Sequence, residues 1–299
     1  MTQPNSSPGS RVAAAPLRGV SPVWLVLVGI ASVQLGAGVA KSLFDEVSPT
    51  TIVWLRLVTS AVVLVLVARP VLRGKSRQDW LVVLGYGASL GLMNWAIYQS
   101  FQRIPLGLAV TIEFVGPLTL AVLGSRRLRD LAWVGLAGLG VLLLGFERSD
   151  LDLAGVAFAV LAGAAWAAYI LLSAETGARW RGLDGLAVAS VVATLLLSPL
   201  ALGRYGDQLA DLHVVLLGAL VGLLSSVVPY TCELVALRSI KPSVFSVLMS
   251  LEPAAAALAG IVVLGELLAP VQWVAMACVV VASVGATRSG RTLAEPVPD

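Results

Sequence analysis

Four ionisable residues lie inside long apolar stretches of this 299-residue chain: Arg56, Glu113, Glu233 and Glu252. Charged side chains are costly in hydrocarbon, so they mark candidate functional sites there. A carboxyl group in a low-dielectric site can take up and release a proton near neutral pH, which is the chemistry that a proton-coupled carrier needs. We therefore predict that Glu113, Glu252 or Glu233 couples proton movement or binds substrate. In the alternative, the four charges only pair with one another and hold helices together.

A proline lies within four residues of each carboxylate in the sequence: Pro117, Pro229 and Pro253. Proline has no backbone N–H, so it leaves the carbonyl four residues earlier without its helical donor. Inside a membrane such irregular backbone is tolerated where it lines a cavity or is buried in protein. The three prolines therefore predict helix breaks beside the carboxylates.

Further polar and aromatic side chains occupy the same apolar stretches. Asn94, Trp95 and Tyr98 share one face of a helix by their spacing, and so do Trp166 and Tyr169. We predict a substrate cavity from nine residues: Asn94, Trp95, Tyr98, Gln34, Arg56, Trp166, Tyr169, Tyr230 and Ser250. Ordinary packing between helices is the alternative for these side chains.

Several kinds of chemistry are missing from the sequence. There is no Gly-x-x-x-x-Gly-Lys-Ser/Thr loop for ATP and no Gly-x-Ser-x-Gly elbow for a hydrolase. One histidine and two cysteines are too few for the usual zinc or haem site. We predict no metal, no cofactor and no enzymatic activity. A channel is a further alternative, although no filter segment repeats.

The elements that must position these residues follow from composition. The chain is 58% apolar and 12% charged, whereas a soluble domain has about 25% charged residues. The apolar residues form blocks about as long as a membrane-spanning helix requires, and none alternates as a membrane strand would. We predict an all-α membrane protein with ten transmembrane helices: 23–40, 50–68, 80–101, 106–124, 131–146, 153–174, 185–202, 214–237, 243–264 and 271–286.

Lys and Arg are unevenly divided between the alternate connectors. With ten spans, one side receives 15 of them and the other side 4. Because basic residues favour the cytoplasmic side, both termini are predicted to be cytoplasmic. The scattered basic residues do not indicate nucleic-acid binding. The predicted partners are the lipid bilayer and a small-molecule substrate, and the sequence predicts no particular oligomeric state.

The two halves of the chain resemble each other. Pro117 follows Ile104 by thirteen residues, and Pro253 follows Ile240 by the same interval. Five spans per half is an odd number, so the halves would have opposite orientations, as in many secondary transporters. We predict a disordered cytoplasmic tail at 1–21, one five-helix repeat at 22–146, its inverted partner at 147–287, and a second cytoplasmic tail at 288–299.

Several strings resemble a known family. Glu113-Phe114-x-Gly116-Pro117, Pro229-Tyr230-x-x-Glu233, Met249-Ser250-Leu251-Glu252-Pro253 and Leu264-Gly265-Glu266 are similar to motifs of the drug/metabolite transporter superfamily, EamA type. Within it the chain resembles the bacterial threonine and homoserine exporters, over residues 22–286. The first half departs from the pattern, with Ser125-Arg126-Arg127 in place of the Gly-Glu pair.

The resemblance implies efflux of small amino acids across the plasma (inner) membrane by proton antiport. Export of another small metabolite or drug is the alternative within the superfamily. A zwitterionic substrate needs an anion for its ammonium group, which Glu113 or Glu252 could supply. Its carboxylate needs donors, which Asn94, Tyr98, Arg56 or a helix end freed at a proline could supply.

Overall fold

The computed structural model describes residues 21–123, 132–133, 135–140, 143, 152–237, 240 and 242–289. These residues form helices and short connections, with no strand in the part described. Eight helices are long and apolar enough to cross a membrane, and Leu106–Leu120 forms a shorter apolar helix. The prediction of an all-α membrane protein is therefore confirmed for these residues, whereas the count of ten spans stays a prediction.

The first half of the chain begins with three uninterrupted helices, α1 (Pro22–Ser42), α2 (Pro49–Ala68) and α3 (Arg77–Phe101). The fourth apolar block is divided into α4 (Leu106–Glu113) and α5 (Val115–Leu123). The predicted fifth span, 131–146, is described only at 132–133, 135–140 and 143, and all of these residues are helical. The predicted tails at 1–21 and 288–299 also lie almost wholly outside the described residues.

The second half begins with α7 (Leu153–Arg179), α8 (Asp184–Tyr205) and the short 3-10 helix η2 (Gly206–Ala210). The eighth block contains α9 (Leu212–Gly222), the π-helical segment η3 (Leu223–Val227) and α10 (Val228–Leu237). The ninth contains α11 (Pro242–Met249), α12 (Glu252–Ala259) and the π-helical segment η4 (Gly260–Leu264), and α13 (Pro270–Ser289) follows. The interruptions thus fall in the blocks that carry the three carboxylates.

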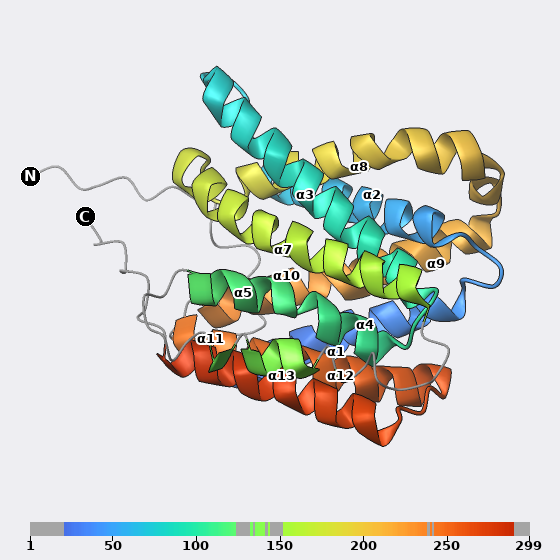
Figure 1. Cartoon of the computed structure of the whole chain (residues 1–299). Coiled ribbons are helices and arrows are strands. Elements are labelled where there is room, and N and C mark those ends of the chain that lie inside the picture. The colour runs from blue at the N-terminus through green and yellow to red at the C-terminus, as the bar shows by residue number, and fades with distance from the viewer. Residues whose placement is uncertain are drawn as a thin grey trace, which may run out of the picture.

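The helices pack as one bundle, and most helix axes run broadly along the same direction (Figure 1). One group consists of α2, α3, α7, α8 and α9, and a second group contains α1, α4, α10, α12 and α13. Helices α4 and α5 join the groups by packing against α7. Large apolar side chains such as Leu66, Leu195 and Val262 remain exposed on the outside, as expected where lipid replaces water as the solvent.

Small residues allow the helices to approach closely. Gly87 and Gly91 of α3 face α8, and Gly218 and Gly222 of α9 face Leu55 and Thr59 of α2. Such small-xxx-small pairs are common where membrane helices pack. Equivalent helices of the two predicted halves therefore use glycine pairs in equivalent contacts.

Candidate functional site

Two interrupted helices carry Glu113 and Glu252. Helix α4 ends at Glu113 and α5 begins at Val115, with Pro117 in its first turn. Helix α11 ends at Met249 and α12 begins at Glu252, with Pro253 as its second residue. In both cases the interruption lies two or three residues before the proline. The proline has no N–H to donate to the carbonyl four residues earlier, so one helical hydrogen bond is missing there. The two carboxylates therefore lie beside irregular backbone inside apolar helices.

A third irregular segment leads to Glu233. The π-helical η3 ends at Val227, and Pro229 is the second residue of α10, which carries Glu233 one turn further on. The backbone N–H of Val228 bonds to the carbonyl of Leu223, five residues earlier. This wider turn changes the pairing of the carbonyls that follow Leu223.

The three carboxylates form one electrostatic group. Glu113 and Glu252 are buried, and Glu233 is half-buried. Glu252 is close enough to interact electrostatically with both Glu233 and Glu113. Within the described ranges none of the three makes an ion pair. In the described structure these carboxylates therefore form no ion pair with Arg56, although the charge of Arg56 interacts electrostatically with Glu113.

Arg56 lies beside this group without pairing to it. Its guanidinium donates to the Tyr98 hydroxyl at 3.3 Å, and its charge interacts electrostatically with Glu113. Tyr230 interacts electrostatically with Arg56 and Glu233, and also with Tyr169. We call the set of seven the central cluster: Arg56, Tyr98, Glu113, Tyr169, Tyr230, Glu233 and Glu252.

Other residues of the predicted cavity are engaged by their neighbours. The Asn94 amide donates to the carbonyl of Leu90 in its own helix at 2.8 Å. The Trp95 indole donates to Thr50 at 3.2 Å. The Ser250 hydroxyl lies 2.7 Å from that of Ser283 in α13. Asn94 thus bonds within its own helix, whereas Trp95 and Ser250 make contacts between helices.

Two predicted residues remain. The Trp166 ring packs edge-on against Phe114, at the α4–α5 interruption, with 5.4 Å between ring centres. Gln34 is buried in α1, and its side-chain oxygen has no hydrogen-bond partner in the described structure. Trp166 therefore packs at the backbone break beside Glu113, whereas the buried side-chain oxygen of Gln34 is left unpaired in the described structure.

The structure adds residues that sequence reasoning missed. The Tyr86 ring packs against Tyr169 with 5.0 Å between ring centres. Ser225 and Ser226 of η3 contact Arg56. A signal for Ser225 was present, because it lies four residues before Pro229 and its carbonyl must lack the helical donor. No comparable sequence signal identified Tyr86.

A second polar network lies at one end of the bundle, which we call the Lys41 end; it carries the connections 43–48, 102–105, 206–211 and 265–269. Lys41 pairs with Glu266 at 2.5 Å and donates to the carbonyl of Ile104 at 2.7 Å. Glu266 also accepts the backbone N–H of Leu106, the first residue of α4, at 2.8 Å. One carboxylate therefore joins α1, α4 and the connection before α13.

The opposite end, which we call the Arg179 end, has its own ties. Arg179 at the end of α7 contacts Asp79 of α3 at 3.4 Å. Lys75 donates to the Arg179 carbonyl at 2.8 Å and lies over the ring of Trp180 at 4.4 Å. Polar contacts thus join the first and second halves of the chain at both ends.

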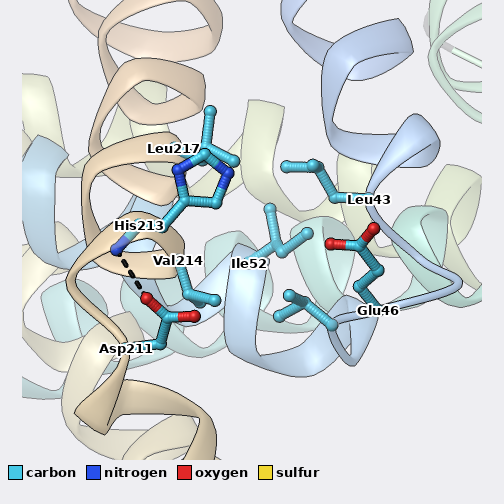
Figure 2. A pocket seen from close by; sticks show the side chains of 8 residues that line it. Leu43, Glu46, Ile52, Asp211, His213, Val214 and Leu217 are labelled. Atoms are coloured by element: carbon cyan, nitrogen blue, oxygen red, sulfur yellow. Dashed lines mark hydrogen bonds between the residues drawn. The ribbon is translucent and has the colours of Figure 1, made fainter.

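Two hollows at the Lys41 end are separate from the central cluster. A cavity of about 100 Å³ has an apolar floor that includes Ile52, and Figure 2 shows His213 and Glu46 on its opposite sides. A more polar hollow of about 320 Å³ is lined by residues 44–48 of the 43–48 connection and in part by Arg103. The single histidine of the chain therefore does not belong to the central cluster.

A metal centre is not formed by the residues described. Among them, no three His, Cys, Asp or Glu side chains are close enough to hold one ion. Cys232 and Cys278 are both free thiols. The chemistry available in the central cluster is therefore that of protons, charges and hydrogen bonds.

Comparison with known proteins places this geometry in context. The EamA-like transporter family matches residues 153–288. The threonine/homoserine exporter RhtA of Escherichia coli K12 is 42% identical over 277 residues, which cover 90% of this chain and 94% of that protein. The RhtA protein of Salmonella typhimurium LT2 is 41% identical and covers 89% of this chain and 92% of its own length. A crystal structure with 19% identity has a TM-score of 0.61, covering 91% of this chain and 99% of that one, which shows a shared fold.

Proposed function

Because this chain belongs to the EamA-like transporter family, we propose that it exports small amino acids such as threonine and homoserine by proton antiport. It is a multi-pass inner-membrane protein, and its relatives are named as exporters of those two amino acids. The observation that carries the proton step is the group of three carboxylates, Glu113, Glu233 and Glu252. Glu252 lies within electrostatic range of both Glu113 and Glu233, and none of the three makes an ion pair in the described structure.

The set of three carboxylates suits both parts of an exchange cycle, proton binding and substrate binding. Like charges that share a low-dielectric site repel one another, so uptake of one proton or of one substrate ammonium group relieves the same repulsion. The two events can therefore compete for Glu113 or Glu252. Competition between a proton and a cationic group for one site is a physical basis for antiport, because the loaded states exclude each other.

We propose ten transmembrane helices in two inverted halves, 22–146 and 147–287. Reciprocal packing supports this arrangement: α3 packs on α7 as α10 packs on α1, and α3 packs on α8 as α9 packs on α2. Contacts between α2 and α8, and between α4 and α12, join equivalent helices of the two halves. Both termini are cytoplasmic in this proposal, which makes the Arg179 end cytoplasmic and the Lys41 end external.

The external end must open for release. In the structure Lys41, Ile104, Leu106 and Glu266 join the two halves there. Breaking these contacts would separate α1 and α4 from the connection before α13. We propose that they form the closed external gate of an alternating-access cycle.

The test uses inside-out vesicles, in which the cytoplasmic face is exposed to the bath. Labelled threonine should accumulate when the vesicle lumen is acidic and should not accumulate without a pH gradient. Glu113→Gln or Glu252→Gln, whichever residue carries the proton, should abolish this accumulation. Counterflow of threonine should persist because it needs no proton step, but at higher threonine concentration, because the amide binds the substrate ammonium group more weakly than the carboxylate does. Glu46→Gln, at an exposed position of the 43–48 connection, is the matched control and should behave as wild type.

Three outcomes contradict the proposal. Failure of threonine, homoserine and other amino acids to move in the wild-type vesicles refutes amino-acid export, and movement of a drug or other metabolite in their place selects the alternative substrate class. Full gradient-driven transport by both Gln variants removes Glu113 and Glu252 as coupling residues. Conductance without saturation indicates a channel.

A further inference from the structure

Arg56 is held by three groups that carry no charge. Its Nε donates to the Ser226 hydroxyl at 3.3 Å, one terminal nitrogen donates to Tyr98 at 3.3 Å, and the other donates to the Ser225 carbonyl at 3.0 Å. No carboxylate in the described ranges lies within ion-pair distance of it. The positive charge of Arg56 is therefore oriented but not neutralised by a neighbouring carboxylate.

The acceptors are available because the helix is irregular at η3. In a regular helix the Ser225 carbonyl would accept the N–H of residue 229, but that residue is Pro229. The N–H of Val228 is taken by Leu223 in the wider π-helical turn, which also releases the carbonyl of Leu224. Ser225 then accepts from Arg56, and Leu224 accepts from Ser32 of α1 at 2.6 Å.

The remaining donors of Arg56 match one particular group. A guanidinium has five N–H donors, and three are used here, one on each nitrogen. One N–H is left on each terminal nitrogen. Two such donors are what a carboxylate needs for bidentate binding, which is the strongest pairing that arginine makes with an anion.

The position of Arg56 relative to Glu113 suits a zwitterion. Arg56 is seven residues from Pro49, where α2 begins, and Glu113 is seven residues from Leu106, where α4 begins. Both helices begin at the Lys41 end, so both side chains branch from the backbone at a depth of about 10 Å, given the rise of an α-helix. They interact electrostatically, and together they present opposite charges at one level of the bundle.

We propose that Arg56 binds the carboxylate of the transported molecule, and that Pro229, the Ser225 carbonyl and the Ser226 hydroxyl position its guanidinium. The chemical class of ligand follows: a small molecule with a free carboxylate, as distinct from an amine or an amide. The proposal rests on the proposed function in taking an amino acid as that molecule. Arg56 is the binding residue in this scheme, and Ser226 and Pro229 are positioning residues.

The test measures binding on the purified full-length protein in detergent, independently of transport. Threonine and homoserine are each compared with the corresponding amide, which keeps the ammonium and hydroxyl groups and loses only the carboxylate charge. Calorimetric titration of the wild type should show binding of each acid about 10- to 100-fold tighter than that of its amide, as expected for hydrogen bonds to a charged group.

Four variants separate binding from folding. Arg56→Lys keeps the charge and loses the paired donors, so the acid-to-amide ratio should fall about tenfold or more while amide affinity stays the same. Ser226→Ala and Pro229→Ala leave Arg56 in place but remove one acceptor or supply a competing N–H donor, so each should lower the same ratio several-fold, by about 2- to 10-fold. Ser226→Thr keeps the hydroxyl and should restore the wild-type ratio.

Ser32→Ala is the matched control, because it removes a hydrogen bond to the same π-helical segment without touching Arg56. It should leave the acid-to-amide ratio unchanged. Equal losses in Ser32→Ala and Ser226→Ala would show general loosening of the segment and overturn the positioning roles.

The subsite itself is overturned by a wild type that binds acids and amides equally or binds neither, or by an unchanged ratio in Arg56→Lys. Acid-selective binding that depends on Arg56, combined with no amino-acid transport in vesicles, would refute the proposed export and leave the carboxylate subsite standing. The two failures are therefore distinguishable.

Discussion

A single methyl group added at Gly163 should disturb the backbone that carries Glu113. Gly163 of α7 faces the α4–α5 interruption, and a Cβ atom placed there would lie 2.5 Å from the Glu113 carbonyl oxygen. Side-chain Cβ atoms essentially never approach another atom within 3.0 Å, so the helices must separate by about half an ångström or more. The contact is with backbone, so no side-chain rotation can relieve it.

The size of the effect follows from overpacking. Gly163→Ala should lower the free energy of unfolding by about 1–3 kcal/mol, the usual cost of forcing extra atoms into a packed interior. Gly177, in the same helix, has no atom within 4 Å of its added Cβ. Gly177→Ala should therefore raise the free energy of unfolding by about 0.5–1 kcal/mol, since alanine is the better helix former.

Thermal unfolding of the purified protein in detergent, followed by tryptophan fluorescence, compares these two variants with wild type. Transport in inside-out vesicles, normalised to folded protein, should also fall in Gly163→Ala because the substitution displaces Glu113. Gly116→Ala, whose Cβ would lie within 2.0 Å of the Gly163 carbonyl oxygen, should be more damaging still. A Tm for Gly163→Ala equal to or above that of Gly177→Ala would refute the close backbone contact on which this reasoning depends.

Three further predictions concern the ends of the bundle and the coupling step. Glu266→Gln should lower the free energy of unfolding by about 1–3 kcal/mol because Lys41 loses its negatively charged partner. A double-mutant cycle with Lys41→Met should recover a coupling energy of similar size, and zero coupling would contradict the pairing. A reporter fused after Arg288 should be active in the cytoplasm and one inserted at 147–152 should be active outside, whereas the opposite result at either position would contradict the ten-span arrangement. Acidifying the vesicle lumen should stimulate threonine accumulation by the wild type, and the Gln variant at the coupling carboxylate should show a flat response to luminal pH; retained stimulation in both Glu113→Gln and Glu252→Gln would exclude both residues.

Much of the fold could be predicted from the sequence, because a bilayer constrains the composition and length of each continuous stretch of chain that crosses it. A spanning helix must be apolar over a set length, so the blocks that became α1, α2, α7 and α13 were visible as runs of hydrophobic residues. The interruptions were also signalled, since a proline removes a hydrogen-bond donor wherever it stands. The structure shows which helices the glycine pairs of α3 and α9 face.

The candidate site could be predicted only as a list of residue types. Asn94 and Tyr98 share one helix face by their spacing, yet Asn94 bonds to its own helix and Tyr98 contacts Arg56. Ser250 lay beside Glu252 in the sequence, but its hydroxyl contacts Ser283 of α13. Spacing along one helix says which side chains share a face, and it says nothing about which other helix that face meets.

The sequence by itself determined that this protein is helical, lies in a membrane and places rare charges beside prolines, because each of these properties depends on local composition. Only the tertiary structure decided that Arg56 is held by Ser225, Ser226 and Tyr98 and not by a carboxylate. These residues are separated by 42 to 170 positions in the chain. Their contact depends on how α2, α3 and η3 pack together, and that packing is set by the shapes of whole helix surfaces, which no local pattern encodes.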